Sequence, residues 1–299
     1  MSNFELSGSQ SYETEEPIIP LSSPVGEFWV KFWGVRGLIP TPCSSNHRYG
    51  GNTACIEISV AGKRLIFDGG TGLRILGRTW QKLQKPLEAH LFFTNSQSSH
   101  IQGFPFFAPA FITENCFHIY GTAASNGASI KQCLGDQMLQ PLFPYPLQAM
   151  QSQLQFYNLS AGSVVKLDDV TITTALINQS QKSVGYRVTD QNHSVAYVTD
   201  LHKNLDLVER DRILQMIQDA DLLIANATYN PPTAYNHEST DVHWKTTVEL
   251  AKSAGVKQLV ISQHHPDDKD DFLDQVQLDI QSVFPKAFLA SEGLVLSVG

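Results

Sequence analysis

The chain has 299 residues, of which 42% are hydrophobic and 17% are charged, a composition that suits one sizeable domain or two small ones. Its formal net charge is -8 and it has no lysine or arginine cluster, so nucleic acid and anionic membrane surfaces are not expected as partners. The sequence shows neither a secretion signal nor an apolar run long enough to span a membrane. We therefore expect a cytoplasmic protein.

The four cysteines, Cys43, Cys55, Cys116 and Cys133, show no Cys-x-x-Cys spacing. In a chain of this length we expect reduced core residues rather than a disulfide framework or a zinc site. Reduced thiols agree with the cytoplasmic location.

Residues 1–25 are rich in serine, proline and glutamate and are predicted to form a flexible tail, because such a composition cannot bury enough apolar area to fold. In an alternative interpretation, Ile18, Ile19 and Leu21 hold part of this tail on the domain surface. Residues 26–299 contain no visible linker and are predicted to form one domain.

From residue 28 onward, the spacing of apolar residues predicts a regular succession of strands and helices. Strands are expected at 28–33, 53–60, 64–67, 87–93 and 117–120, with helices beginning at Leu73 and spanning about 129–138. Short strands follow at 154–158, 164–167, 170–176, 184–189 and 194–198. The remainder predicts helices near 205–219, 242–253 and 271–284, and strands at 222–225, 258–262, around 288 and at 294–298. Two β-rich halves with helices suggest two packed sheets covered by helices.

Two polar segments follow expected strands, at the end where α/β proteins place their chemistry. The first is the loop Thr94-Asn95-Ser96-Gln97-Ser98-Ser99-His100. The second, Asp68-Gly69-Gly70-Thr71-Gly72, lacks both the dinucleotide and the Gly-Lys-Ser/Thr patterns, so we interpret it as a tight structural turn. The aromatic segment 103–107 is expected to form core or a pocket wall.

Several motifs together resemble the metallo-β-lactamase superfamily of metal-dependent hydrolases. They are Phe32-Trp33-Gly34-Val35-Arg36-Gly37, residues 48–53, 65–74 and 100–107, and the segments 184–187 and 195–200, which resemble a bacterial phosphodiesterase-like branch. The resemblance covers about residues 27–299. It implies an α/β (α+β) fold, a four-layer αββα sandwich, with a two-metal site at one edge that normally holds Zn, Mn or Fe.

The resemblance also implies seven metal-ligand positions, most of which carry amides or hydroxyls in this chain. In the pattern His-x-His-x-Asp-His, Asn95 and Gln97 stand for histidines, Ser99 stands for the aspartate, and His100 agrees. Elsewhere, Gln179 and Gln263 stand for histidines and Asp200 keeps the bridging aspartate. A Gly-His-Ser-Thr-Trp segment that lies over the site becomes residues 240–244, which include Asp241.

These replacements predict a site without a metal cofactor. A neutral amide is a far poorer zinc ligand than imidazole or carboxylate, and His100 and Asp200 remain only weak candidates. Asn, Gln and Ser can hydrogen-bond one another, and we expect His100 and Asp200 to pair. We therefore predict a non-catalytic pseudo-hydrolase that binds a protein partner or a small ligand. The possible pocket residues are Arg36, Arg48, Tyr49, Asp68, Asp241, His264 and His265.

Alternatives remain open at this stage. In one alternative interpretation, the chain is a divergent hydrolase or phosphodiesterase with a metal site rebuilt from His264, His265 and Asp268. A metal-free set of Ser99, His100 and Asp200 is less favoured, because sequence neighbours seldom face one another and no Gly-x-Ser-x-Gly elbow is present. Structural roles are also possible: Arg36 and Arg48 as ties between loops through backbone carbonyls, and Asp68 as a support behind the polar loop.

Overall fold

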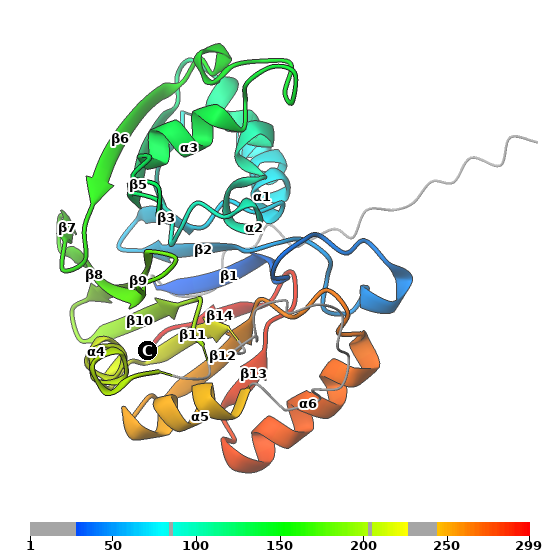
Figure 1. The fold of residues 1–299 in the computed structure, drawn as a ribbon, viewed down its shortest axis with the longest axis vertical. Helices are drawn as coiled ribbons and strands as arrows, with labels where there is room; N and C mark the ends of the chain where they lie inside the picture. The colour runs from blue at the N-terminus through cyan, green and yellow to red at the C-terminus, as the bar shows by residue number, and fades with distance from the viewer. Residues whose placement is uncertain (1–27, 84–85, 203–204, 227–243) are drawn as a thin grey trace, which may run out of the picture.

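The computed structural model describes residues 28–83, 86–202, 205–226 and 244–299. Two seven-stranded sheets lie face to face, and helices cover the outer face of each (Figure 1). This arrangement confirms the predicted αββα sandwich. The predicted tail at residues 1–25 and the candidate pocket residue Asp241 lie outside the described residues.

The first sheet has the strand order β14-β1-β2-β3-β4-β5-β6. The pairs from β14 to β3 are antiparallel and those from β3 to β6 are parallel. Its strands are β1 (Trp29–Gly34), β2 (Cys55–Val60), β3 (Lys63–Phe67), β4 (Glu88–Phe92), β5 (Cys116–Thr122), β6 (Gln153–Leu159) and β14 (Val295–Ser297).

The second sheet has the order β13-β12-β11-β10-β9-β8-β7, parallel from β13 to β10 and antiparallel from β10 to β7. Its strands are β7 (Val164–Leu167), β8 (Val170–Asn178), β9 (Ser183–Asp190), β10 (His193–Val198), β11 (Leu222–Asn226), β12 (Gln258–Ser262) and β13 (Ala287–Leu289). Each expected strand is therefore present, with bounds shifted by a few residues at most.

The helices divide between the two sheets (Figure 1). The first sheet is covered by α1 (Gly72–Trp80), α2 (Ser98–Ile101) and α3 (Ile130–Asp136), and the second by α4 (Leu207–Ile217), α5 (Trp244–Ser253) and α6 (Asp270–Val283). Short 3-10 helices are η1 (Ser44–Asn46), η2 (Gln81–Leu83), η3 (Phe104–Phe106), η4 (Ala108–Phe111) and η5 (Leu147–Ala149).

The two-residue period of the strands explains the layers, because successive side chains point to opposite faces. In β4, Phe92 belongs to the apolar cluster between the sheets, whereas Leu91 belongs to the cluster under α1 and α3. A third cluster lies under α4, α5 and α6. In the aromatic segment, Phe104 and Phe107 are buried as predicted, but Phe106 is 54% exposed.

The cysteine prediction is right in part. Cys55 is buried, but Cys43 is exposed, Cys116 and Cys133 are half-buried, and all four are free thiols. Among the described residues, no helix is both long and apolar enough to cross a membrane.

Candidate functional site

The candidate site lies where four strands end. Asp68 follows β3, the polar loop from Thr94 follows β4, and Asp200 and Gln263 come shortly after β10 and β12. Asp68, Asp200 and Gln263 have φ values of 60°, 60° and 57°. This left-handed backbone is uncommon outside glycine, and it redirects the chain at these three strand ends.

Asp68 is the centre of a buried hydrogen-bond network. Its carboxylate accepts hydrogen bonds from the backbone N–H of Thr94 at 2.9 Å and from the hydroxyl of Tyr197 at 2.8 Å. The Thr94 hydroxyl also donates to it, at 2.9 Å. Nδ1 of His100 lies 2.8 Å from Oδ2 of Asp68. Asp68 thus supports the polar loop from behind, in the structural role considered from the sequence.

The Asp68 carboxylate determines the charge of His100. Burial alone lowers the pKa of this imidazole, but the charge of Asp68, its hydrogen bond and the charge of Asp200 outweigh burial and raise the pKa to about 9. At neutral pH His100 is therefore an imidazolium, and it compensates the buried Asp68 charge.

Asp200 is paired with a different residue. The amide Nδ2 of Asn95 donates a hydrogen bond to Oδ2 of Asp200 at 2.5 Å and lies 3.5 Å from the Ser183 hydroxyl. Asn95 Oδ1 accepts a hydrogen bond from the backbone N–H of Gln97 at 2.7 Å. The expected hydrogen-bonded pair of His100 and Asp200 is therefore wrong: each faces a nearer partner, and the two interact only through their charges.

The other ligand positions contribute unequally. Gln263 is buried, and its Nε2 lies 3.5 Å from the Tyr197 hydroxyl, which joins it to the Asp68 network. Gln97 is exposed and donates to Gln181 Oε1 at 2.7 Å. Ser99 is buried in α2, and Gln179 is exposed in the turn between β8 and β9.

The side chains of Ser99 and Gln179 take part in none of the contacts that join Asp68, Asn95, Asp200 and Gln263. The structure therefore brings together Asn95, His100, Asp200 and Gln263 but not Gln179. The structure also gives no support to a catalytic triad of Ser99, His100 and Asp200, because Nδ1 of His100 faces Asp68 instead of Asp200.

The glycine turn after Asp68 packs directly against the polar loop. The backbone N–H of Gly69 donates to the His100 carbonyl at 2.6 Å. A side chain at Gly70 would meet the Ser99 carbonyl oxygen at 2.4 Å, and one at Gly103 would meet the Gly70 oxygen at 1.9 Å. The turn is therefore required for close packing, as a structural turn predicts.

Arg36 and Arg48 connect loops in different ways. Arg36 is fully buried and donates to the backbone carbonyls of Gly50 at 2.7 Å and Asp268 at 2.8 Å. Arg48 instead forms ion pairs with the Asp271 and Asp274 carboxylates of α6, at 2.7 and 2.6 Å. The role through backbone carbonyls is thus right for Arg36 and wrong for Arg48.

Tyr49 also contacts α6, since its hydroxyl donates to Oδ1 of Asp274 at 3.0 Å. Together with Arg48, it holds the loop before β2 on this helix. The side chains of Arg48 and Tyr49 therefore face α6 and lie outside the Asp68 network.

The three residues considered for a rebuilt metal site have structural partners. Nε2 of His264 donates to the Ala290 carbonyl at 2.7 Å, and burial lowers the pKa of His264 to about 4. Oδ2 of Asp268 accepts from the backbone N–H of His265 at 3.0 Å. Within the described ranges, His264, His265 and Asp268 do not form a group with three ligand atoms close enough for one ion.

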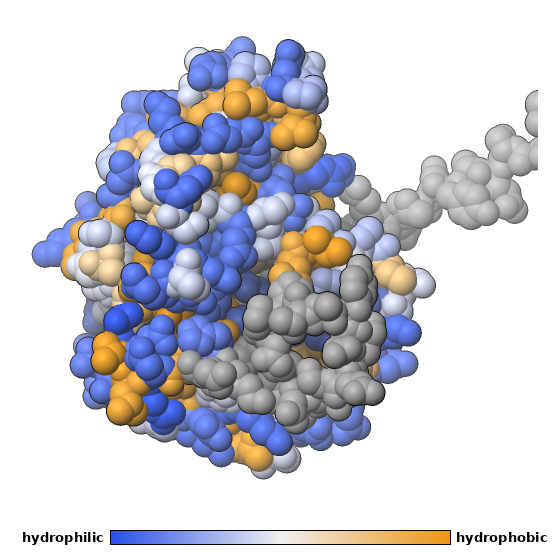
Figure 2. Space-filling model, in the orientation of Figure 1, coloured by the Kyte–Doolittle hydropathy of each residue, from blue (hydrophilic) through white to orange (hydrophobic). Residues whose placement is uncertain are grey.

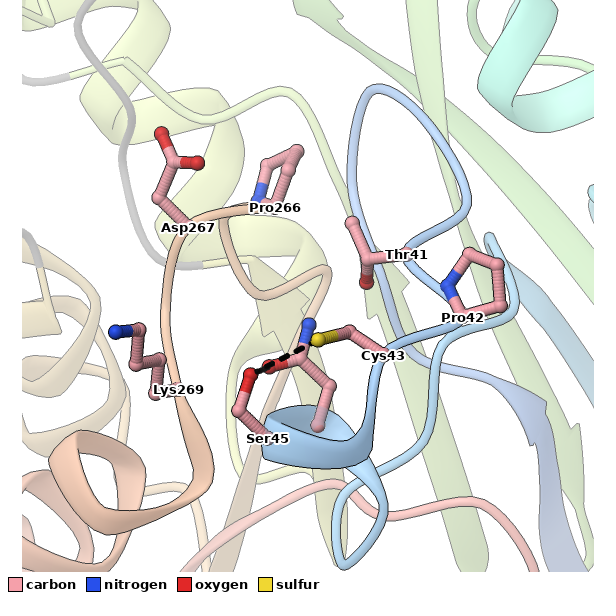
Figure 3. Close-up of a pocket in the computed structure, with 8 residues that line it drawn as sticks. Thr41, Pro42, Cys43, Ser45, Pro266, Asp267 and Lys269 are labelled. Carbon is pink, nitrogen blue, oxygen red and sulfur yellow. Dashed lines mark hydrogen bonds between the residues drawn. The ribbon is translucent and has the colours of Figure 1, made fainter.

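An open groove of about 580 Å³ lies beside these loops, between the segment 41–46 and the segment 266–269 (Figure 3). Its lining includes Cys43, Asp267 and Lys269. Hydrogen bonds from Ser45 and Ser44 lower the pKa of the Cys43 thiol. The residues that line the groove are separate from the Asp68 network.

An exposed apolar surface beside α3 was not found from the sequence. Phe106, Leu139, Leu142 and Tyr145 are 54%, 53%, 82% and 61% exposed. Figure 2 shows hydrophobic surface near the top of the view, where Figure 1 places α3. From the sequence, the prolines of segment 141–146 predict only a break between helix and strand. The spacing of apolar residues does not predict which side chains of a loop are exposed. We call these four residues the α3 patch.

The α3 patch adjoins the polar loop. Nε2 of Gln137, at the end of α3, donates to the carbonyl of Ile101 in α2 at 3.1 Å. The rings of Phe106 and Phe143 pack edge to face with centroids 5.5 Å apart. Anything bound to the patch would therefore lie against the segment that contains His100.

The two facing sheets, the outer helices and the cluster of polar residues at the strand ends define a protein of the metallo-β-lactamase fold. A family model described as the beta-lactamase superfamily domain matches residues 63–264, and the chain belongs to this superfamily.

Solved structures share this fold at low sequence identity. The metallo-β-lactamase fold protein YhfI from Bacillus subtilis is 18% identical, with a TM-score of 0.62 over 91% of this chain and 99% of that chain. A diphosphatase from the PhnP family is 15% identical, with a TM-score of 0.63 over 90% and 97%. Zn²⁺-bound PqqB from Methylobacterium extorquens is 12% identical, with a TM-score of 0.63 over 90% and 99%. No curated protein matches the chain significantly.

The side chains at the strand ends do not fit the two-metal centre that the superfamily resemblance implies. Zinc is held by imidazole nitrogen, thiolate or carboxylate, and most of these positions offer an amide or a hydroxyl. Only His100 and Asp200 are groups of the right type, and Asp200 is bonded to Asn95.

Proposed function

We propose that this chain is a pseudo-hydrolase, a member of the superfamily that has lost the hydrolytic two-metal centre and acts by binding. The observation that carries the proposal is the pairing of charges at the strand ends. The buried Asp68 carboxylate faces the His100 imidazolium, and Asp200 faces the Asn95 amide. A buried charge without a partner is costly, and here the chain supplies the partners that a cation would otherwise supply.

His100 alone cannot hold a dication in the same place. Its Nδ1 contacts Asp68, as in a ligand with an outer partner, but Asp200 is the only other one of the seven positions that keeps a ligand-type side chain. Asn95 and Gln263 offer amide groups, which cannot replace histidine as strong ligands. Without a bound cation, water near these residues keeps its ordinary acidity, so no hydroxide nucleophile is available.

We propose a protein partner that binds over the α3 patch. Exposed apolar surface of this kind marks interaction sites on soluble proteins, and loops carry such contacts more often than the elements they connect. Because Gln137, at the end of α3 beside the patch, bonds to Ile101 of α2, the partner would bind close to the former hydrolytic edge of the fold.

The alternative of a hydrolase with a rebuilt site has less support. Such a site needs imidazole nitrogens free to face an ion, but Nε2 of His264 is committed to the Ala290 carbonyl. Asp268 is likewise committed to the backbone of its own loop.

The first experiment tests the loss of hydrolysis. The purified full chain is incubated with bis(p-nitrophenyl) phosphate and with a diphosphate ester, each with added Mn²⁺ or Zn²⁺. We expect no turnover above that of the Asp200→Asn and His100→Ala variants. Metal-dependent turnover that both substitutions abolish would show a working centre and would contradict the proposal.

The second experiment tests the binding surface. Leu142→Glu puts a charge in the centre of the α3 patch, while Leu207→Glu puts the same charge at a position on α4 that is 79% exposed. Proteins captured from the native host by the unmodified chain should be lost with Leu142→Glu and kept with Leu207→Glu. Equal capture by both variants would exclude the α3 patch as the binding surface.

A further inference from the structure

A second group of ligand-type side chains lies on β4 and β5, apart from the strand ends discussed above. In the parallel register of these strands, Glu88 is opposite Cys116 and His90 is opposite His118. Residues two apart on a strand share one face, so the four side chains form a square on the same side of the sheet. Phe92 and Tyr120, the next residues on this face, belong to the apolar cluster between the sheets. The square therefore lies at the amino-terminal part of β4 and β5, at the margin of that cluster.

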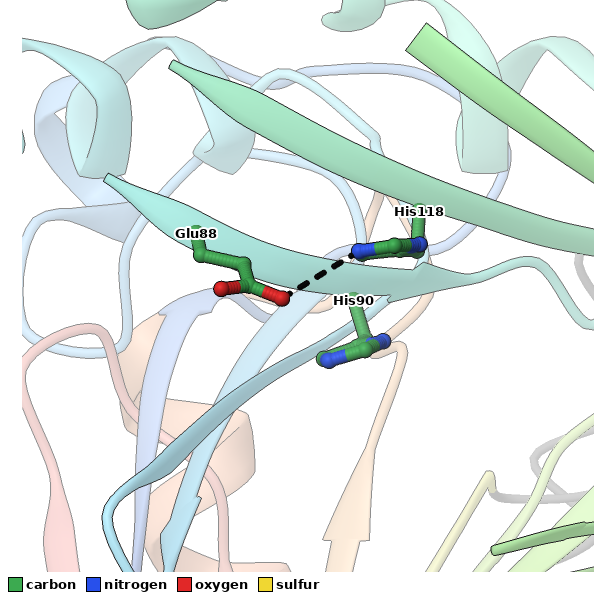
Figure 4. Close-up of side chains that lie close together, drawn as sticks. All are labelled: Glu88, His90 and His118. Atoms are coloured by element: carbon green, nitrogen blue, oxygen red, sulfur yellow. Dashed lines mark hydrogen bonds and ion pairs between the residues drawn. The ribbon is translucent and has the colours of Figure 1, made fainter. Parts of the chain in front are cut away.

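The functional atoms converge within coordination range. One ligand atom from each of Glu88, His90 and His118 lies within 4.8 Å of the others (Figure 4). Nε2 of His118 is 3.3 Å from Oε1 of Glu88 and 3.7 Å from Sγ of Cys116. Among the described residues, no other group of three or more His, Cys, Asp or Glu side chains has its ligand atoms this close together.

The second nitrogen of each imidazole is held by a tyrosine. Nδ1 of His118 lies 3.1 Å from the Tyr157 hydroxyl, and Nδ1 of His90 lies 3.3 Å from the Tyr120 hydroxyl. Metal-binding histidines characteristically bond through their other ring nitrogen to an outer partner, which sets the tautomer and orients the ring. Both rings of this pair have that arrangement.

The ring stack makes the pair rigid. The His90 and His118 rings are stacked with centroids 4.6 Å apart, and the Tyr120 and Tyr157 rings beside them are stacked at 4.6 Å. The lone pair of an imidazole lies in the plane of its ring, so one of the two rings has to tilt out of the stack for both to bind one ion. His118 is half-buried and Glu88 is exposed, so an ion can reach the group from solvent.

The group combines buried and accessible donors. His90 is buried, and the exposed carboxylate of Glu88 supplies negative charge beside it.

We propose that Glu88, His90 and His118 bind one divalent transition-metal ion, with zinc preferred, and that Cys116, whose Sγ lies 3.7 Å from Nε2 of His118 but outside the converged group of three, moves in as the fourth ligand. Nitrogen, sulfur and oxygen donors in a group of four match the tetrahedral coordination of zinc. Binding converts the Cys116 thiol to a thiolate and releases one proton to solvent. The site is structural: it ties β4 to β5 and uses none of the residues at the strand ends.

The test is a titration of metal-free full chain with Zn²⁺ in competition with a chromophoric chelator. We expect one tightly bound ion per chain. His118→Ala should weaken binding by more than about 100-fold, because it removes a direct ligand, and Tyr157→Phe by about 10-fold, because it removes an outer partner. His193→Ala, an exposed histidine at the start of β10, is the matched control and should change nothing.

A Co²⁺ titration identifies the sulfur ligand. The unmodified chain should show a thiolate-to-cobalt charge-transfer band, which Cys116→Ser abolishes. Circular dichroism of each variant checks that the fold is kept, and Glu88→Gln provides a second ligand change at an exposed side chain in case another variant fails to fold.

The outcomes separate this proposal from the proposed function. Loss of the ion with His118→Ala but not with His100→Ala supports the β4–β5 site and leaves the pseudo-hydrolase proposal standing. Absence of tight binding overturns the β4–β5 site alone. Binding that depends on His100 and Asp200 instead of His118 overturns both.

Discussion

Nδ1 of His100 and Oδ2 of Asp68 lie 2.8 Å apart, and both side chains are almost completely buried, at 3% and 0% exposure. The contact joins the end of β3 to α2 and holds a positive and a negative charge away from water. Asp68 also accepts hydrogen bonds from Thr94 and Tyr197, so four groups converge on one carboxylate. Stability at the edge of the sandwich should therefore depend strongly on this pair.

Asp68→Asn should destabilise the chain by about 3 to 5 kcal/mol, the usual cost of removing one partner of a buried ion pair. The substitution keeps the shape of the side chain, and asparagine tolerates the left-handed backbone at this position. Urea unfolding followed by circular dichroism measures the change.

The control is Asp168→Asn, which removes an exposed carboxylate paired with Lys63 and also sits at a positive φ of 54°. Surface pairs contribute little, so its unfolding midpoint should stay close to that of the parent chain. Equal effects of the two substitutions would show that the Asp68 pair has no special role.

The same pair predicts a loss of stability at alkaline pH. The pKa of His100 in the folded chain is about 9, above its value of about 6.5 in an unfolded chain, so the folded state binds more protons between these values. The stabilisation is complete below the unfolded pKa and is lost as the pH rises through the folded pKa. At about 1.4 kcal/mol per pKa unit it amounts to about 3 kcal/mol at most.

Measurements of the unfolding free energy at intervals from neutral to alkaline pH give the slope of stability against pH. NMR titration of the His100 ring should show the raised pKa directly. In Asp68→Asn the slope should become much smaller, because the carboxylate that raises the pKa is absent. An unchanged slope in that variant would assign the pH dependence to other groups.

The sequence was sufficient to predict the layers of the fold. Strand periodicity identifies positions such as Phe92 and Leu91 on opposite faces of β4, and the glycine turn after Asp68 predicts the bend into α1. Such signals are local, since each comes from the spacing of neighbouring residues.

Which side chains pair with one another at the strand ends could not be predicted in the same way. His100 and Asp200 come from segments 100 residues apart, and which carboxylate faces His100 depends on the position of Asp68 behind the loop. Arg48 illustrates the same limit, because its partners lie on α6, more than 200 residues away. Sequence patterns identify the residue types at a site but not the pairs that tertiary packing forms.

His264→Ala should destabilise the chain by about 2 to 4 kcal/mol, because it leaves the Ala290 carbonyl without its donor and opens a cavity beside the Tyr49 ring. His265→Ala, at a side chain that is 39% exposed, should cost much less. Chemical denaturation of both variants gives the comparison. If His264 were instead a ligand of a rebuilt hydrolytic site, its removal would abolish metal-dependent phosphodiesterase activity without a large loss of stability.

Restoring ligands should restore metal binding at the strand ends. The combined substitutions are Asn95→His, Gln97→His, Ser99→Asp, Gln179→His and Gln263→His. The backbone conformation of the site is already present at Asp200 and Gln263, and histidine is among the residues that tolerate a positive φ.

The restored chain should bind Zn²⁺ more tightly at this site than the parent by over about 100-fold, because direct ligands contribute at least as much as outer partners. Both chains should carry His118→Ala, so that an ion on β4 and β5 does not enter the comparison. Adding Asp200→Asn should remove the gain, since the bridging carboxylate is then absent. Equal zinc binding by the restored and parent chains would mean that the amides and hydroxyls at these positions are not what excludes the metal.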